Sequence, residues 1–94
     1  MEDHKTRPGK IYIIESPNTD DVYVGSTFQE LEDRFRGHTP TNKTQSKRVI
    51  NAGDATIRLL KSVECVSERD LEYHERACIK MYPNAVNKKL TAGL

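Results

Sequence analysis

Two tyrosines lie in two short runs rich in isoleucine and valine, at a spacing that can bring two phenol groups together. Residues 10–15 read Lys-Ile-Tyr-Ile-Ile-Glu and residues 21–27 read Asp-Val-Tyr-Val-Gly-Ser-Thr, with proline, asparagine and aspartate between them. This pattern predicts a hairpin of two antiparallel strands. With a four-residue loop, Tyr12 and Tyr23 pair directly and share one face with Gly25. A glycine on that face lets another group approach the backbone closely.

A carboxylate is the second candidate for chemistry. A predicted late helix has an otherwise apolar stripe with Glu75 in its middle. The residues of the stripe fall at i, i+4, i+7, i+8 and i+11, namely Leu71, Glu75, Cys78, Ile79 and Tyr82. An inward-facing Glu75 must be paired, hydrogen-bonded or bound to a cation, because burying a bare carboxylate is costly. The pattern leaves two alternatives open: a structural partner such as Arg34, or a metal-binding or catalytic role.

A first helix is expected after the predicted hairpin. Thr27 and Glu30 form a capping box, and Gly37 ends the helix. Four residues fall at i, i+3, i+4 and i+7, namely Leu31, Arg34, Phe35 and His38. Leu31 and Phe35 should dock inward, with the other two on an adjoining row.

The remaining elements follow from turn and capping signals. Residues 39–51 form a polar loop, with a short helix around residues 46–52 as an option, and residues 56–63 read as a third strand. Ser67 and Asp70 open the late helix, which Pro83 closes near Tyr82. The expected fold is α/β of the α+β kind: a small three-stranded antiparallel sheet flanked by helices in the order β-β-α-(α)-β-α. Residues 1–94 form one domain, with residues 1–9 as an N-terminal arm.

Composition narrows the class of protein. The chain has 94 residues, of which 35% are hydrophobic and 31% charged, which excludes a disordered chain. No apolar run is long enough to span a membrane, and the polar start is no signal peptide. We therefore expect an intracellular protein, cytoplasmic or nuclear, in which Cys65 and Cys78 are reduced thiols.

The charge is distributed unevenly along the chain. The formal net charge is only +1, but residues 34–48 carry five basic side chains, one histidine and no carboxylate, whereas carboxylates gather in residues 64–75. Such a stretch supplies donors for phosphate oxygens. Two solvated faces of opposite sign explain the same pattern without any nucleic acid.

Jointly, these residues resemble the GIY-YIG nuclease superfamily. Residues 10–12 stand at the first tripeptide of the family and residues 23–25 at the second. The other matches are Leu31, Arg34 and His38 in the first helix, Glu75 four residues before Ile79, and Asn87 after Pro83. The similarity covers residues 10–87. One departure is that Lys10 replaces the first glycine, with Gly9 one place earlier.

The resemblance implies a divalent-metal-dependent endonuclease acting on nucleic acid, with DNA as the expected substrate. It implies catalytic roles for six residues, namely Tyr12, Tyr23, Arg34, His38, Glu75 and Asn87. Glu75 would bind Mg²⁺ (or Mn²⁺), Arg34 the scissile phosphate, and Tyr12 would be the general base or a relay. The nucleic-acid-binding set would be Gly25, Arg36, Lys43, Lys47 and Arg48. All catalytic groups are expected to converge on the tyrosine face of the sheet.

Other functions remain open on the sequence. The chain can have this fold without catalysis and act as a module that binds nucleic acid or a partner. An unrelated small α+β RNA-binding domain would need stacking aromatics on an exposed sheet face, and the six aromatics are poorly placed for that. Zinc binding by His74 and Cys78 offers only two ligands. Targeting could come from an additional domain, a partner subunit or dimerisation, and no membrane association is expected.

Overall fold

The fold is a three-stranded antiparallel sheet with helices on both faces. The computed structural model describes residues 6–36 and 46–86. Its elements, in order, are β1 (Arg7–Ser16), β2 (Thr19–Thr27), α1 (Leu31–Arg36), α2 (Lys47–Asn51), β3 (Thr56–Cys65) and α3 (Glu68–Ile79). This confirms the predicted α+β class and the order β-β-α-α-β-α, including the short helix before the third strand.

The first strand is the centre of the sheet. The strand order is β2-β1-β3, and β1 is antiparallel to both neighbours. β1 begins earlier than predicted, because Arg7, Pro8 and Gly9 pair with Cys65, Glu64 and Val63 of β3. The predicted N-terminal arm is therefore wrong for residues 7–9, which complete the central strand.

The two tyrosines share a face of the sheet but are not direct partners. Tyr12 pairs with Gly25, and Tyr23 pairs with Ile14. Near the turn Ser16 pairs with Thr19, so from Ile14 to Ser16 the first strand advances two residues while β2 advances four. The predicted direct pair is wrong because of these two extra residues. An even shift preserves the alternation of side chains, so both tyrosines stay on one face.

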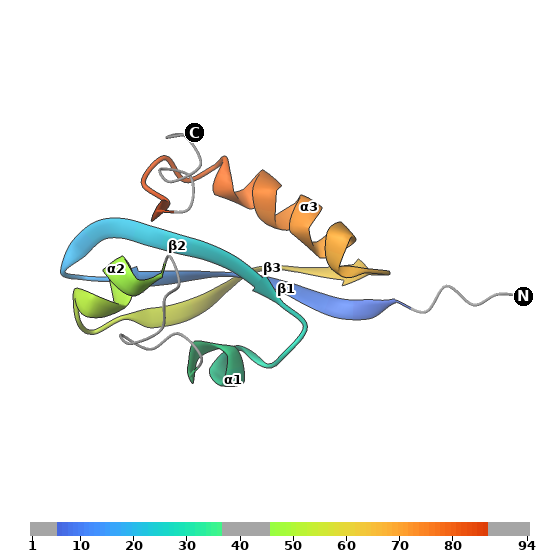
Figure 1. Ribbon diagram of the computed structural model, residues 1–94, viewed down its shortest axis with the longest axis horizontal. Helices are drawn as coiled ribbons and strands as arrows, with labels where there is room; N and C mark the ends of the chain where they lie inside the picture. The colour runs from blue at the N-terminus through green and yellow to red at the C-terminus, as the bar shows by residue number, and fades with distance from the viewer. Residues whose placement is uncertain (1–5, 37–45, 87–94) are drawn as a thin grey trace, which may run out of the picture.

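Helices cover both faces of the sheet (Figure 1), and each face has its own hydrophobic core. α3 covers one face, where the cluster of buried residues is Ile11, Ile13, Val22, Val24, Cys65, Leu71, Cys78 and Ala85. The opposite face, with α1 and α2, buries Tyr12, Ile14, Val49 and Val86 and packs against the partly buried Tyr23, Leu31 and Phe35. The predicted division of the hairpin side chains between two faces is confirmed, as is the inward docking of Leu31 and Phe35.

The two predicted capping boxes differ in outcome. At α3, the Ser67 hydroxyl accepts a hydrogen bond of 3.3 Å from the Asp70 N–H, and the Asp70 carboxylate accepts one of 3.2 Å from the Val66 N–H. Before α1, Thr27 Oγ1 instead accepts from the Gln29 N–H at 3.0 Å, and the helix begins only at Leu31. The box is therefore wrong for α1, where a local turn takes the place of a cap.

The segment after α3 passes along the outer edge of β2. α3 ends at Ile79, earlier than predicted. Ala85 then forms a parallel bridge with Val22, and the Val22 N–H donates to the Asn84 carbonyl at 3.2 Å. Ala85 belongs to the core under α3 and Val86 to the core on the other face, so the chain crosses from one face to the other at this edge.

Cys65 and Cys78 are both free and buried. None of the described helices has the length and apolar character needed to cross a bilayer.

Candidate active site

Tyr12 and Gly25 are in contact with each other within the candidate site. Tyr12 is completely buried in the middle of the sheet, and its ring lies across the backbone of Gly25 on β2. A Cβ atom at residue 25 would come within 2.8 Å of ring carbon Cε1 of Tyr12, and closer still to the hydroxyl end. The ring of Tyr23 lies 6.3 Å away, tilted by 43°. The phenol of Tyr12 therefore points toward the edge strand β2.

Arg34 is the cation of the site. It lies in α1, whose neighbours Leu31 and Phe35 pack onto the tyrosine face and so direct Arg34 toward Tyr12. Arg34 Nε donates a hydrogen bond of 3.2 Å to the Tyr12 hydroxyl oxygen. The pKa of Arg34 is raised: burial lowers it, but the hydrogen bond with Tyr12 and the electrostatic effects of Tyr12, Tyr23 and Glu75 together outweigh burial. The guanidinium therefore keeps its charge.

Glu75 reaches the site from the other side of the sheet. It lies on α3, and its carboxylate accepts a hydrogen bond from the hydroxyl of Ser26. Ser26 pairs with Ile11, so its side chain belongs to the α3 face. The charge of Glu75 nevertheless acts on Tyr12, Tyr23 and Arg34. The expected convergence on one face is wrong for Glu75, because the groups meet around the edge of β2.

The environment of Glu75 combines partial burial with a single hydrogen-bond donor. Burial raises the pKa of Glu75, the Ser26 hydrogen bond opposes the rise, Glu72 adds to it, and Arg34 and Arg76 oppose it. Within residues 6–36 and 46–86 Glu75 forms no ion pair, and Arg34 donates to Tyr12. The carboxylate is thus half-buried, with the Ser26 hydroxyl as its hydrogen-bond donor among the described residues.

The two phenols are neutral at ordinary pH. Burial is the main cause that raises the pKa of Tyr12, and Glu75 adds to it, while Arg34 opposes the rise through its hydrogen bond and its charge. The pKa of Tyr23 is also raised, mainly by burial and further by Tyr12 and Glu75, while the charge of Arg34 lowers it. A phenolate at Tyr12 therefore needs more positive charge nearby than Arg34 supplies.

The remaining predicted residues are distributed more widely. Arg36 is exposed and forms an ion pair of 2.9 Å with Asp33. Arg48, on α2, lies 3.5 Å from Asp21, near the start of β2, and the adjacent Lys47 is exposed. Asp21, the partner of Arg48, lies five residues before Ser26 on β2. At the usual rise per residue of a strand, the two are roughly 17 Å apart. The structure therefore keeps Lys47 and Arg48 away from Arg34, whereas Arg36 lies two residues after Arg34 on α1 and is turned to Asp33. The predictions for His38, Lys43 and Asn87 lie outside the described residues.

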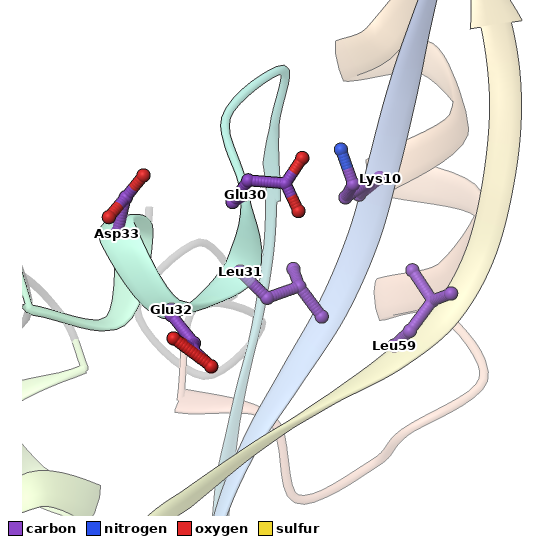
Figure 2. Close-up of a pocket in the computed structure, with 6 residues that line it drawn as sticks. All are labelled: Lys10, Glu30, Leu31, Glu32, Asp33 and Leu59. Carbon is purple, nitrogen blue, oxygen red and sulfur yellow. The ribbon is translucent and has the colours of Figure 1, made fainter.

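The lysine in place of the first glycine of the family is accommodated at the surface. Lys10 lies with Tyr12 on the α1 side of the sheet, beside a hollow of about 410 Å³ between β1, β3 and the start of α1. Figure 2 shows Glu30 turned toward Lys10 across this hollow. Gly9 does not replace the missing glycine, because it faces the opposite core, where an added Cβ would lie 2.6 Å from Leu71 Cδ1.

Some features of the site were not anticipated from the sequence. Ser26, the partner of Glu75, could have been found, because alternation from Val24 places it on the α3 face. A groove of about 460 Å³ opens beside it, lined by Arg7, Ser26, Thr27, Phe28, Gln29, Arg34, Glu68, Leu71 and Glu72. No short-range pattern indicated this groove, because it joins the starts of β1 and α3 to the end of β2.

A zinc site is not assembled from the described parts of the chain. There, no three histidine, cysteine, aspartate or glutamate side chains come together as ligands. His74 instead contacts the ring of Tyr73 edge-on, with centroids 5.5 Å apart.

Comparison with known proteins adds an independent finding. The model of the GIY-YIG catalytic domain matches residues 8–89. The chain is also 36% identical over 83 residues to the MSV199 domain-containing protein 146R of Invertebrate iridescent virus 6. That alignment covers 81% of this chain and 34% of the viral protein, so the chain spans about a third of that relative's length. No solved structure matches the chain.

Proposed function

This chain belongs to the GIY-YIG catalytic domain family, whose members are generally endonucleases, and on that premise we propose that it is itself a divalent-metal-dependent endonuclease. It hydrolyses phosphodiester bonds in nucleic acid, with DNA as the expected substrate. One observation carries the proposal: Glu75, half-buried and bonded to Ser26 without an ion pair among the described residues, acts on the same tyrosine that Arg34 touches. Such a carboxylate has the properties of a cation ligand.

The residues present fit a hard divalent cation. Mg²⁺ commonly takes one or two protein carboxylates and keeps water and phosphate oxygens in its other positions. Glu75 offers one such carboxylate, and the Ser26 hydroxyl fixes its orientation. When bound there, Mg²⁺ or Mn²⁺ would neutralise charge on the phosphate and on the attacking oxygen.

Arg34 binds the scissile phosphate. Its side chain makes one hydrogen bond to the described residues, from Nε to the Tyr12 hydroxyl. The terminal N–H groups of the guanidinium are then left for phosphate oxygens. A guanidinium held by a buried phenol keeps its geometry through the reaction and stabilises the charge that develops on the phosphate.

Tyr12 orients the attacking water and relays its proton, and Tyr23 positions the water or the phosphate. The raised pKa of Tyr12 means that a base role depends on the extra positive charge of the metal-loaded site. His38, as a second base or phosphate ligand, and Asn87, as a hydrogen-bonding group, stay predictions.

Targeting is the part of the function that this domain supports least directly. The viral relative is about three times as long as the region it shares with this chain. We therefore propose that an additional domain, a partner subunit or a second copy of the chain supplies selection of the cleavage site.

The test is cleavage of a panel of linear, branched and flapped nucleic acids, with Mg²⁺, Mn²⁺ or chelator. We expect cleavage by the wild-type protein with metal, and none with chelator. Glu75→Gln should abolish cleavage while keeping the fold. The control is Glu64→Gln, at an exposed position of β3 where Glu64 accepts a hydrogen bond from Thr6, and this variant should cleave normally. Full activity of Glu75→Gln would refute the metal assignment. Binding of nucleic acid without cleavage under any metal would favour the alternative, a catalytically inactive binding module.

A further inference from the structure

The groove beside the candidate site shares two residues with it. Arg34 lines the groove, as does Ser26, which donates to Glu75. With a volume of about 460 Å³, the groove has room for one small planar group and its surrounding water. A ligand in this groove would lie next to a phosphate held by Arg34, and both could belong to one nucleic-acid strand.

One wall of the groove is a stacked pair. The Arg7 guanidinium carbon lies 3.9 Å from the centroid of the Phe28 ring. Arg7 is exposed, whereas Phe28 is partly buried against the core under α3, so the ring is anchored and the guanidinium is its outer layer. Bases of unpaired nucleotides stack on aromatic rings and on guanidinium planes.

The groove is also lined by two carboxylates. Glu68 and Glu72 both line the groove from the first half of α3, one helical turn apart, and both are exposed. Carboxylates repel phosphate but accept hydrogen bonds from N–H groups. Each nucleobase has an N–H donor on its Watson–Crick edge, which is available only when the base is unpaired.

We propose that this groove binds an unpaired nucleobase next to the phosphate that Arg34 holds. The base stacks on the Arg7–Phe28 pair, and its Watson–Crick edge donates to Glu68 and Glu72. This inference rests on the proposed nuclease function and specifies its substrate class: nucleic acid with an unpaired nucleotide at the cleavage site, rather than continuous duplex.

The first experiment measures binding without cleavage. In chelator, affinity is determined by fluorescence anisotropy for three versions of one labelled duplex: fully paired, with one extruded 2-aminopurine, and with an abasic residue at the extruded position. We expect the extruded base to bind about 5- to 100-fold more tightly than the abasic version, the range that stacking of one base supplies. The fluorescence of 2-aminopurine should fall on binding. Equal affinity for the extruded base and the abasic residue would overturn the proposal.

Variants test whether the groove is responsible. Arg7→Lys keeps the charge but removes the planar guanidinium, and Phe28→Leu keeps an apolar side chain against the core but removes the ring. Both should lose the preference for the extruded base while keeping their affinity for paired duplex. Arg58→Lys, on exposed β3 and paired with Glu15, is the matched control and should keep the preference. Retention of the preference in both groove variants, with circular dichroism unchanged, would refute the site.

Failure of this inference can be told from failure of the nuclease proposal. If the wild-type protein with Mg²⁺ cleaves fully paired and extruded-base duplexes equally, and Arg7→Lys does the same, the nuclease stands and the base subsite falls. If the base preference is present in chelator but no metal supports cleavage, the subsite stands and the nuclease falls.

Discussion

The phenol ring of Tyr12 lies against Gly25, its direct partner on the neighbouring strand. The three atoms nearest to a Cβ built at Gly25 all belong to Tyr12. Any side chain at residue 25 must therefore displace this ring, and with it the hydroxyl that receives the Arg34 hydrogen bond. One glycine thus sets the position of the phenol relative to the guanidinium.

Gly25→Ala should destabilise the protein and disable the site. Overpacking of this kind costs about 1–3 kcal/mol of unfolding free energy, which urea titration measures. Because the displaced ring cannot keep its hydrogen bond with Arg34, any nuclease activity should fall with it. A double-mutant cycle with Tyr12→Leu provides the control: the cost of the alanine should shrink once the ring is absent. An equal cost in both backgrounds would show that the close contact is not the cause.

Glu75→Gln should stabilise the metal-free protein at neutral pH. Burial is the main cause that raises the pKa of Glu75 above the unfolded value of about 4.3. Below that value the carboxyl is protonated in both states and destabilises neither. As the pH rises through the folded pKa, ionisation destabilises the folded state, so stability is lost in the wild type but not in the glutamine variant.

Urea unfolding in chelator between pH 4 and pH 8 measures this difference. The advantage of Glu75→Gln should be largest at pH 8 and should shrink toward pH 4. Glu64→Gln, at an exposed position on β3, is the control and should show no such trend. A glutamine variant that is less stable than the wild type at every pH would contradict the prediction.

Mg²⁺ should reverse the effect of Glu75 on stability. A ligand that binds only the folded state stabilises it by mass action, and 10 mM Mg²⁺ with a dissociation constant on the order of 1 mM contributes about 1.4 kcal/mol. For a domain of this size the melting temperature should rise by roughly 5 to 10 °C. The shift should be absent in Glu75→Gln and when NaCl of equal ionic strength replaces Mg²⁺. The same shift in the variant would locate the cation elsewhere.

The sequence predicts the division of side chains between faces better than it predicts which residues meet. Alternation in β1 and β2 places Tyr12, Tyr23 and Gly25 on one face, and an even shift of register leaves that result intact. The direct tyrosine pair fails because the two extra residues of β2 near the turn have no local signature. The isoleucine and valine pattern is equally compatible with the register that pairs Tyr12 with Tyr23 and with the observed register that pairs Tyr12 with Gly25.

The position of Glu75 was beyond sequence reasoning for a different reason. Helical periodicity places it correctly beside Leu71 and Cys78 on the face of α3 that packs against the sheet. Whether that helix lies on the tyrosine face or on the opposite one depends on tertiary packing. Only the position of β2 at the sheet edge lets a carboxylate from one face act on phenols of the other.

Arg34→Lys tests the geometry of the guanidinium rather than its charge. Lysine keeps the positive charge, but it lacks Nε and the fork of terminal N–H groups, so it cannot both donate to Tyr12 and bind phosphate bidentately. We expect kcat to fall about 100- to 1,000-fold, the typical cost of losing one preorganised donor to transition-state charge. KM should change little, because the charge that attracts the nucleic acid remains. Arg58→Lys, exposed on β3, is the matched control and should cleave at the wild-type rate. A variant that loses affinity in proportion to activity would instead make Arg34 a simple binding residue.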